Sequence, residues 1–310
     1  GYKSLQQFYF PLYPFLIRSL AIFFDPEFSS YVVSGILISN ASLFLALIGL
    51  YKLARLDYSE KVSKLAIILI LLFPTSFYFG AVYTESIFLC LAVWSFYLFR
   101  TNKFLFASIL AMLSSSTRVV GITILPAFLV NIFWDRKLIK KELLSLLFIP
   151  IGLLSYMYYL FLYWGGSIKL YQAYKLFGEQ RSDHIVLLPQ VFYRYLVKII
   201  PNLSWGYFPV VFAVLLETFA ATLFLYLIII SFRKIRWDYW MFSVLGYLIP
   251  TTSGSFSSMP RYLILIFPMF FVLAQKLEFA KKSLLIGIFL ILATMLIVAE
   301  SLFFRGYFVS

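Results

Sequence analysis

Charged residues are scarce in this chain of 310 residues. Asp, Glu, Lys and Arg together make up 13% of it, whereas soluble domains carry roughly 25%. Hydrophobic residues account for 63%, and the mean hydropathy is +0.93. This composition excludes an ordinary soluble protein and predicts an all-α polytopic membrane protein.

Cysteine and histidine are almost missing, with one residue of each. Because Cys90 is the only cysteine, no disulfide can form within the chain. The sequence also contains no nucleotide-binding loop, metal-ligand cluster or nucleophile motif. We therefore expect no chemistry with a soluble nucleotide at the cytoplasmic face and no defined cofactor, with a divalent metal left open.

The net charge of +13 is high, but it does not indicate nucleic acid as a partner. Sixteen Lys and Arg residues lie in short connections between apolar runs, as the positive-inside rule predicts for cytoplasmic loops. They are Lys52, Arg55, Lys61, Lys64, Arg100, Lys103, Arg136, Lys137, Lys140, Lys141, Arg233, Lys234, Arg236, Lys276, Lys281 and Lys282. The remaining connections are then extracytoplasmic, at residues 1–10, 25–30, 74–86, 117–121, 164–205 and 251–261 and at the C-terminus.

The apolar runs predict the helices of a single transmembrane domain, residues 1–310. Several are shorter than the roughly 20 residues that cross the hydrocarbon, so we expect some helices to stop near a cavity. The first run contains Arg18 and two prolines, which favours a re-entrant or interfacial helix and leaves about ten crossings. The runs cover residues 8–24, 31–51, 62–79, 80–99, 103–117, 119–134, 142–163, 206–232, 238–251, 260–275 and 283–304.

Residues 73–86 (FPTSFYFGAVYTES) interrupt an otherwise apolar sequence. A proline, a glycine, hydroxyl groups and the Glu85 carboxylate are costly in lipid and usually face a cavity. We interpret the stretch as a break between two helices on the outer side. Tyr83, Thr84 and Glu85 are predicted to bind substrate there, with Glu85 as an orienting carboxylate.

Two arginines lie at predicted outer helix junctions. Arg118 stands between two apolar runs, and Arg261, followed by Tyr262, opens the run 260–275. A guanidinium binds phosphate with two parallel hydrogen bonds, so we predict that both arginines contact an anionic substrate, with Tyr262 beside Arg261. In the first helical turn the Arg261 charge would oppose the helix dipole, and an anion would correct this. The alternatives are that Arg118 caps carbonyls or pairs with Glu85, and that Arg261 simply snorkels.

The stretch 164–205 is predicted to be a long extracytoplasmic loop. Tyr and Trp residues beside acids are a common composition for gripping sugars, so Trp164, Asp183 and His184 are weaker candidates for the site. For His184 the alternative is a solvent-exposed histidine without a chemical role.

Five blocks of the sequence resemble the GPI mannosyltransferase II family, in which analogous blocks occur in the same order. The family belongs to the GT-C glycosyltransferases, integral membrane enzymes that take sugars from polyprenyl- or dolichyl-phosphate on the extracytoplasmic or lumenal side. The resemblance implies a mannosyltransferase that acts on a glycolipid, glycan or protein acceptor. The blocks are residues 10–14 (FPLYP), 81–86 (AVYTES), 117–121 (TRVVG), 259–262 (MPRY) and 305–309 (RGYFV).

Members of that family begin with a membrane helix and an extracytoplasmic Trp-Asp motif, whose Asp is the expected catalytic base. A Gly-Tyr pair follows, and this chain starts with such a pair, Gly1 and Tyr2. By this resemblance we expect the first helix and the base to lie upstream of Gly1, so that the chain would not be active alone. The resemblance also implies the plasma membrane in a prokaryote and the endoplasmic reticulum membrane in a eukaryote.

Two other classes of function stay open. One is a multi-pass transporter or flippase of lipid-linked saccharides, which should show paired discontinuous helices at the midplane. The other is a non-catalytic membrane subunit, which an upstream Trp-Asp motif would argue against. The polar motifs lie toward the predicted outer side, which favours the enzyme, but the acceptor and the exact sugar are not specified by the sequence.

Overall fold

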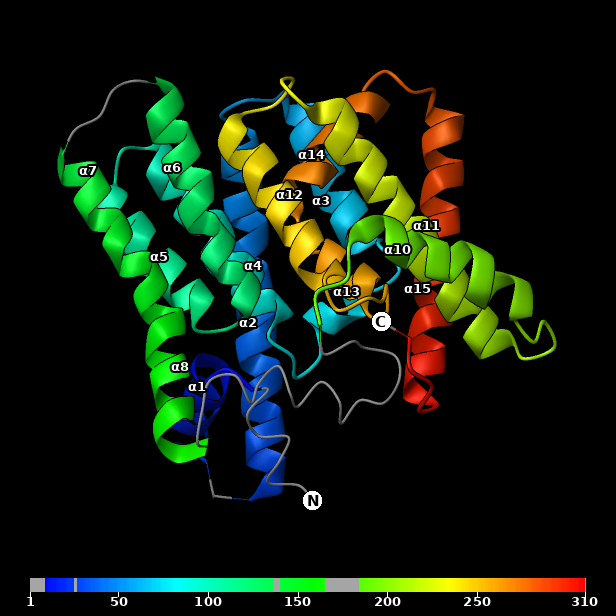
Figure 1. Cartoon of the computed structure of the whole chain (residues 1–310), viewed down its shortest axis with the longest axis horizontal. Helices are drawn as coiled ribbons and strands as arrows, with labels where there is room; N and C mark the ends of the chain where they lie inside the picture. The colour runs from blue at the N-terminus through cyan, green and yellow to red at the C-terminus, as the bar shows by residue number, and fades with distance from the viewer. Residues whose placement is uncertain (1–8, 25–26, 136–139, 165–183, 310) are drawn as a thin grey trace. The chain divides into compact units, whose positions relative to one another are not determined.

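The computed structural model describes residues 9–24, 27–135, 140–164 and 184–309, and every regular element within these ranges is a helix (Figure 1). The contacts divide the chain into two compact units. Unit 1 comprises Gly1–Ser63, Tyr78–Ala173 and Arg236–Phe242. Unit 2 comprises Lys64–Phe77, Tyr174–Ile235 and Ser243–Ser310.

Unit 1 is built around α4 (Glu85–Arg100), in which Phe88, Leu89, Ala92 and Phe96 are fully buried. One side of α4 packs on α2 and the other on α5, and α8 lies against α5 (Figure 1). Around them lie α1 (Leu12–Ala21), α2 (Phe28–Ala54), α5 (Phe104–Ser115), η4 (Val119–Thr123), α6 (Ile124–Asp135), α7 (Lys140–Ser145), η5 (Leu146–Phe148) and α8 (Ile149–Trp164).

The two ends of α4 carry opposite charges. Glu85 is its first residue and Arg100 its last, and at 1.5 Å per residue they are roughly 22 Å apart. An acid at the amino end and a base at the carboxyl end both interact favourably with the helix dipole. Each of them also lies in a polar cluster, so the helix links two polar regions of unit 1.

Unit 2 is built around α11 (Phe208–Ser231), which packs on α13 and α14. Leu216 of α11 forms an apolar cluster with Ala299 and Leu302 of α15 and with Val309. The helices of this unit are most of α3 (Glu60–Leu71), α10 (Leu188–Tyr193), the π-helix η7 (Arg194–Ile199), η8 (Ile200–Asn202), α11, most of α12 (Trp237–Thr251), α13 (Met259–Leu263), α14 (Phe267–Leu277) and α15 (Lys282–Phe304). The short helix η3 (Ser76–Phe79) lies where the chain passes between the units.

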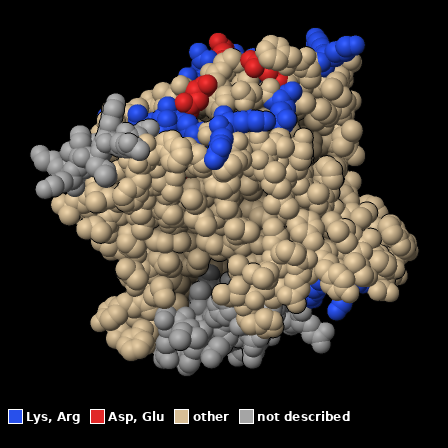
Figure 2. Space-filling view, turned by 45° about the horizontal axis from the view of Figure 1, so that its top comes forward, with Lys and Arg blue, Asp and Glu red and all other residues tan. Residues whose placement is uncertain are grey.

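Four helical segments in the described part of the chain are long and apolar enough to cross a membrane. They are Phe28–Ala54, Leu143–Tyr163, Phe208–Ser231 and Lys282–Phe304. In the view of Figure 2, broad areas of the surface carry no charged side chains, as a membrane protein requires. The expected number of about ten crossings, the GT-C architecture and the single domain stay predictions.

Two segments differ from the helices expected from hydropathy. The run 260–275 is not one helix, because α13 ends at Leu263 and α14 begins at Phe267. Pro268 at the start of α14 has no N–H group to continue the hydrogen bonding of α13. The predicted loop 164–205 contains helical structure from Leu188 to Asn202, and its residues 165–183 lie outside the described part.

Candidate functional site

Glu85 and Arg118 form an ion pair in unit 1. Arg118 Nη1 lies 2.5 Å from Glu85 Oε1 and 3.2 Å from Thr84 Oγ1. The Glu85 side chain is fully buried, and that of Arg118 is 11% exposed. Of the alternatives for Arg118, pairing with Glu85 is therefore the one observed. Both of these contacts are made through Nη1 of the guanidinium.

The break before α4 places Glu85 at the amino end of a helix. Helix α3 ends before Pro74, η3 follows, and α4 begins directly after Thr84. Ser86 Oγ donates a hydrogen bond of 2.6 Å to Phe79 O, which ties the break to the first turn of α4. The predicted interruption is thus confirmed, and its consequence is a buried carboxylate stabilised by the helix dipole.

Arg118 follows α5 through a tight turn. Thr117 Oγ1 donates to Ser114 O at 2.6 Å, and Arg118 itself is extended, with φ −155° and ψ 146°. Gly121 of η4 packs against the end of α5, where an added Cβ would lie 2.5 Å from the Ser114 carbonyl carbon. A Cβ on Gly152 of α8 would also overlap backbone and hydroxyl oxygens at this end of α5. Two glycines therefore allow the close packing that positions Arg118.

Tyr13 of α1 joins the same region. Its hydroxyl donates to Gly35 O at 3.0 Å and lies 2.7 Å from Ser39 Oγ, while Ser39 Oγ donates to Tyr83 O at 3.4 Å. Burial raises the pKa of Tyr13, the Ser39 hydrogen bond lowers it and the Glu85 carboxylate raises it, because a nearby negative charge disfavours a phenolate. We call this group the Glu85 cluster: Tyr13, Ser39, Tyr83, Thr84, Glu85 and Arg118.

Arg261 and Tyr262 lie in unit 2, in the five-residue helix α13, and both are half-buried. The expected conflict between Arg261 and a helix dipole is wrong, because so short a helix places Arg261 equally in its last turn. The turn at residues 255–258 directly precedes this helix.

Sequence reasoning missed Glu217, the buried carboxylate beside that turn. Glu217 Oε2 accepts a hydrogen bond of 2.9 Å from the Tyr195 hydroxyl, and Oε1 accepts one of 3.2 Å from the Ser258 N–H. Glu217 lies near the middle of a helix that is a candidate membrane span, and the residue is 6% exposed. A carboxylate within a 24-residue apolar helix is itself a signal of a functional or structural site.

A second polar cluster, at the Arg100 end of α4, was also missed. Arg100 binds both oxygens of Asp57, at 2.5 and 2.9 Å, and the Tyr239 hydroxyl donates to Asp57 at 3.3 Å. Asp238, fully buried, accepts a hydrogen bond of 2.9 Å from Asn131. These residues tie together segments that the charge pattern predicts to be cytoplasmic, and we interpret the cluster as structural.

Of the weaker candidates, the described part of the structure includes the side chain of His184. His184 is exposed. Asp183 lies outside the described residues, as does the side chain of Trp164, whose backbone ends α8. Among the residues described, no group of three or more His, Cys, Asp or Glu side chains is arranged to hold a metal ion.

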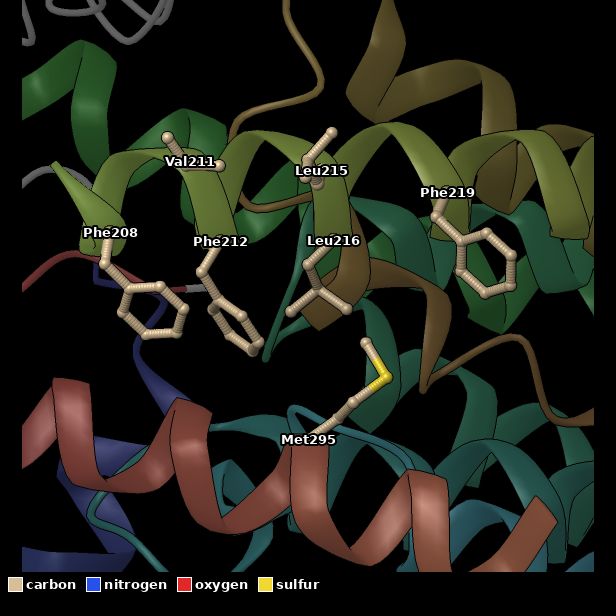
Figure 3. Close-up of a pocket in the computed structure, with 7 residues that line it drawn as sticks. All are labelled: Phe208, Val211, Phe212, Leu215, Leu216, Phe219 and Met295. Carbon is tan, nitrogen blue, oxygen red and sulfur yellow. The ribbon is translucent and has the colours of Figure 1, made fainter. Parts of the chain in front are cut away.

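An apolar groove of about 280 Å³ lies between α11 and α15 in unit 2. Figure 3 shows aromatic rings of α11 and the Met295 side chain of α15 extending into it. Both helices are candidate membrane spans, so the groove is suited to a hydrocarbon chain. It is lined by Phe208, Val211, Phe212, Leu215, Leu216, Phe219 and Met295.

No family model, curated protein or solved structure matches the chain.

Proposed function

We propose that the protein is an integral membrane glycosyltransferase. It moves a sugar, with mannose as the first candidate, from a polyprenyl- or dolichyl-phosphate donor to a hydroxyl of a glycolipid, glycan or protein acceptor. The reaction takes place on the extracytoplasmic or lumenal side, in the plasma membrane of a prokaryote or the endoplasmic reticulum of a eukaryote.

One observation carries the proposal: the five sequence blocks form two groups, one within each unit. The first three meet in the Glu85 cluster of unit 1. The last two both reach α11 in unit 2, where Ser258, directly before the fourth block, bonds to Glu217, and Val309, in the fifth, packs with Leu216. Ionisable side chains buried within an apolar membrane protein, such as those that the first three blocks surround, are by default candidates for a functional site.

The residues of these clusters suit the chemistry of sugar transfer. The bond between the sugar C1 and the phosphate oxygen breaks, and a bond from C1 to the acceptor oxygen forms. The acceptor proton passes to a carboxylate, and a cation must stabilise the phosphate that leaves with the lipid. We take Arg118 of unit 1 and Arg261 of unit 2 each as a candidate for contact with the phosphate. Tyr83, Thr84 and Glu85 in the first unit and Tyr262 in the second are the candidates for orienting the substrate.

The apolar groove beside α11 supports the choice of a lipid-linked donor. A polyprenyl chain needs an apolar path between helices that opens to the bilayer, and the groove is bounded by two helices of spanning length.

A transfer assay tests the proposal. Membranes that contain the full-length protein are incubated with polyprenyl-phosphate carrying tritiated mannose, and labelled products are separated by solvent extraction and acid precipitation. We expect transfer that falls about 100-fold or more in Arg118→Ala and in Arg261→Ala, the size typical for removal of a group that stabilises transition-state charge. Arg55→Ala, at an exposed arginine that donates to the nearby Tyr58 carbonyl, is the matched control and should keep full activity.

Two results would contradict the proposal. Full transfer in both arginine variants would remove their role at the phosphate. Movement of intact labelled donor across sealed vesicles, without cleavage of the sugar–phosphate bond, would support a flippase in place of an enzyme.

A further inference from the structure

Glu217 is the tenth residue of α11, about 14 Å from the start of the helix at 1.5 Å per residue. A carboxylate at such a depth is costly, by roughly 2.5–3.5 kcal/mol on insertion scales for a charged residue at the helix centre. Such a residue persists only where other groups satisfy it. In this helix the compensation comes from outside, through the Tyr195 hydroxyl and the Ser258 N–H.

The groups that satisfy Glu217 also build the turn before α13. The Tyr195 hydroxyl lies 3.1 Å from Ser255 Oγ, and Ser255 Oγ accepts a hydrogen bond of 3.0 Å from the Ser257 N–H. Ser258, which donates to Glu217, has φ +64°. A non-glycine residue in this left-handed region costs free energy and persists only when its surroundings hold it. The carboxylate of Glu217 is one of the groups that hold it.

The residue before Tyr195 in η7 makes a second contact with the chain next to the turn 255–258. The neighbouring Arg194 donates to Gly254 O at 3.2 Å, and Gly254 has φ +80°. Two left-handed residues, 254 and 258, are therefore held by adjacent side chains of the π-helix η7 and by Glu217. Helix α13 begins at the next residue, so the direction of its first turn depends on these contacts.

We propose that Glu217 is a positioning residue, a buried carboxylate within the membrane span that holds the turn 255–258 and thereby orients Arg261 toward the donor phosphate. This inference rests on the proposed function for the role of Arg261. The claim that Glu217 holds the turn is supported by the hydrogen bonds and by the left-handed conformation of Ser258. It can be tested by a measurement that does not depend on transfer activity.

The glutamine and leucine variants separate positioning from a role of the negative charge. In Glu217→Gln the amide oxygen still accepts from the Ser258 N–H, and the amide nitrogen can donate to the Tyr195 hydroxyl, which then donates to Ser255. In Glu217→Leu both hydrogen bonds disappear and the Ser258 N–H is left buried without its acceptor. A positioning role therefore predicts rescue by glutamine and loss with leucine.

The first measurement is hydrogen–deuterium exchange on the detergent-solubilised protein, over peptides that cover residues 253–262. We expect about tenfold faster exchange in Glu217→Leu, the effect of losing roughly one hydrogen bond to a charged group, and exchange within about twofold of the wild type in Glu217→Gln. The matched control on the same helix is Thr222→Val, which removes only a bond within α11, to Thr218 O. Unchanged exchange in Glu217→Leu would overturn the proposal.

The second measurement is transfer from polyprenyl-phosphate mannose by the full-length protein with the same variants, alone and combined with Arg261→Ala. We expect Glu217→Leu to raise the donor KM about tenfold, with near-normal values in Glu217→Gln. In the Arg261→Ala background, Glu217→Leu should add little, because the two residues act through one contact. Additive losses, or a glutamine variant as impaired as leucine, would overturn the proposal. Absence of transfer by the full-length wild type would contradict the proposed function instead, and the exchange result would still decide whether Glu217 holds the turn.

Discussion

Gly121 offers the sharpest test of how unit 1 positions Arg118. A Cβ added at this residue would lie 2.5 Å from Ser114 C and Ser115 N and 2.6 Å from Ser114 O. Optimal carbon contacts are about 3.5–4.0 Å, so in Gly121→Ala the backbone of η4 must move away from α5 by about 1 Å. The neighbours are backbone atoms and cannot turn aside as a side chain would.

Overpacking of this kind typically lowers stability by about 1–3 kcal/mol. The shift of η4 away from α5 would also reach Arg118. Arg118 lies three residues before Gly121, and its N–H and that of Thr117 bond to the same Ser114 carbonyl that the new methyl group would approach. We therefore expect Gly121→Ala to lower stability by about 1–3 kcal/mol and also to loosen the ion pair with Glu85. Transfer activity should fall with it, although no functional group has been removed.

The assay is thermal unfolding in a fixed detergent, followed by transfer at a temperature where the variant stays folded. Gly287→Ala is the matched control, because nothing lies within 4 Å of a Cβ at this residue of α15. Alanine is also the better helix former by roughly 0.5–1 kcal/mol, so the control should be neutral or stabilising. A Gly121→Ala protein with the stability and activity of the wild type would refute the argument from close packing.

Three further outcomes follow from the charged residues. Glu85→Gln should lower the free energy of unfolding by about 3–5 kcal/mol, because it leaves the Arg118 charge buried without its carboxylate. Glu85→Gln combined with Arg118→Met should recover most of this loss in the same unfolding assay, and a double variant less stable than the single one would contradict the explanation. Asp57→Asn should lower the free energy of unfolding by only about 1 kcal/mol, since the ion pair of Asp57 with Arg100 is partly exposed. The difference in stability between this variant and the wild type should shrink at high salt, and an unchanged difference would argue against an electrostatic origin. Burial first, and the nearby Asp57 charge second, raise the pKa of Tyr58 from 10.0 to about 12. The free energy of unfolding that the neutral phenol contributes is therefore complete below pH 10 and is lost as pH rises through 12. Tyr58→Phe should reduce this alkaline loss of stability, measured by unfolding against pH, and an identical profile would exclude Tyr58 as its source.

Hydropathy alone located most of the helices. The apolar run 206–232 became α11, and the run 283–304 became α15. Hydropathy failed where the ends depend on backbone chemistry, as at Pro268, which starts a new helix inside an apolar run. It also overlooked Glu217, since one carboxylate hardly changes the average over a window of 18 or more residues.

The candidate site was predictable only in part. The interruption before Glu85 and the position of Arg118 at a helix junction are visible in the residue types, because prolines, hydroxyls and charges are costly in lipid. Which of them meet is not visible. The partner of Arg118 lies 33 residues away along the chain, and residue types do not specify such a distance in space.

The sequence by itself determined the class of the protein, because its composition leaves too few charged residues to cover a soluble surface and its apolar runs recur at helical length. It also determined where the polar breaks fall, since these are local departures from hydrocarbon. The tertiary structure alone decided the partners: Arg118 with Glu85, and Glu217 with a turn 41 residues further along. The physical reason is that burial and hydrogen bonding depend on how closely helices approach, and that approach is set at a few contact points such as Gly121.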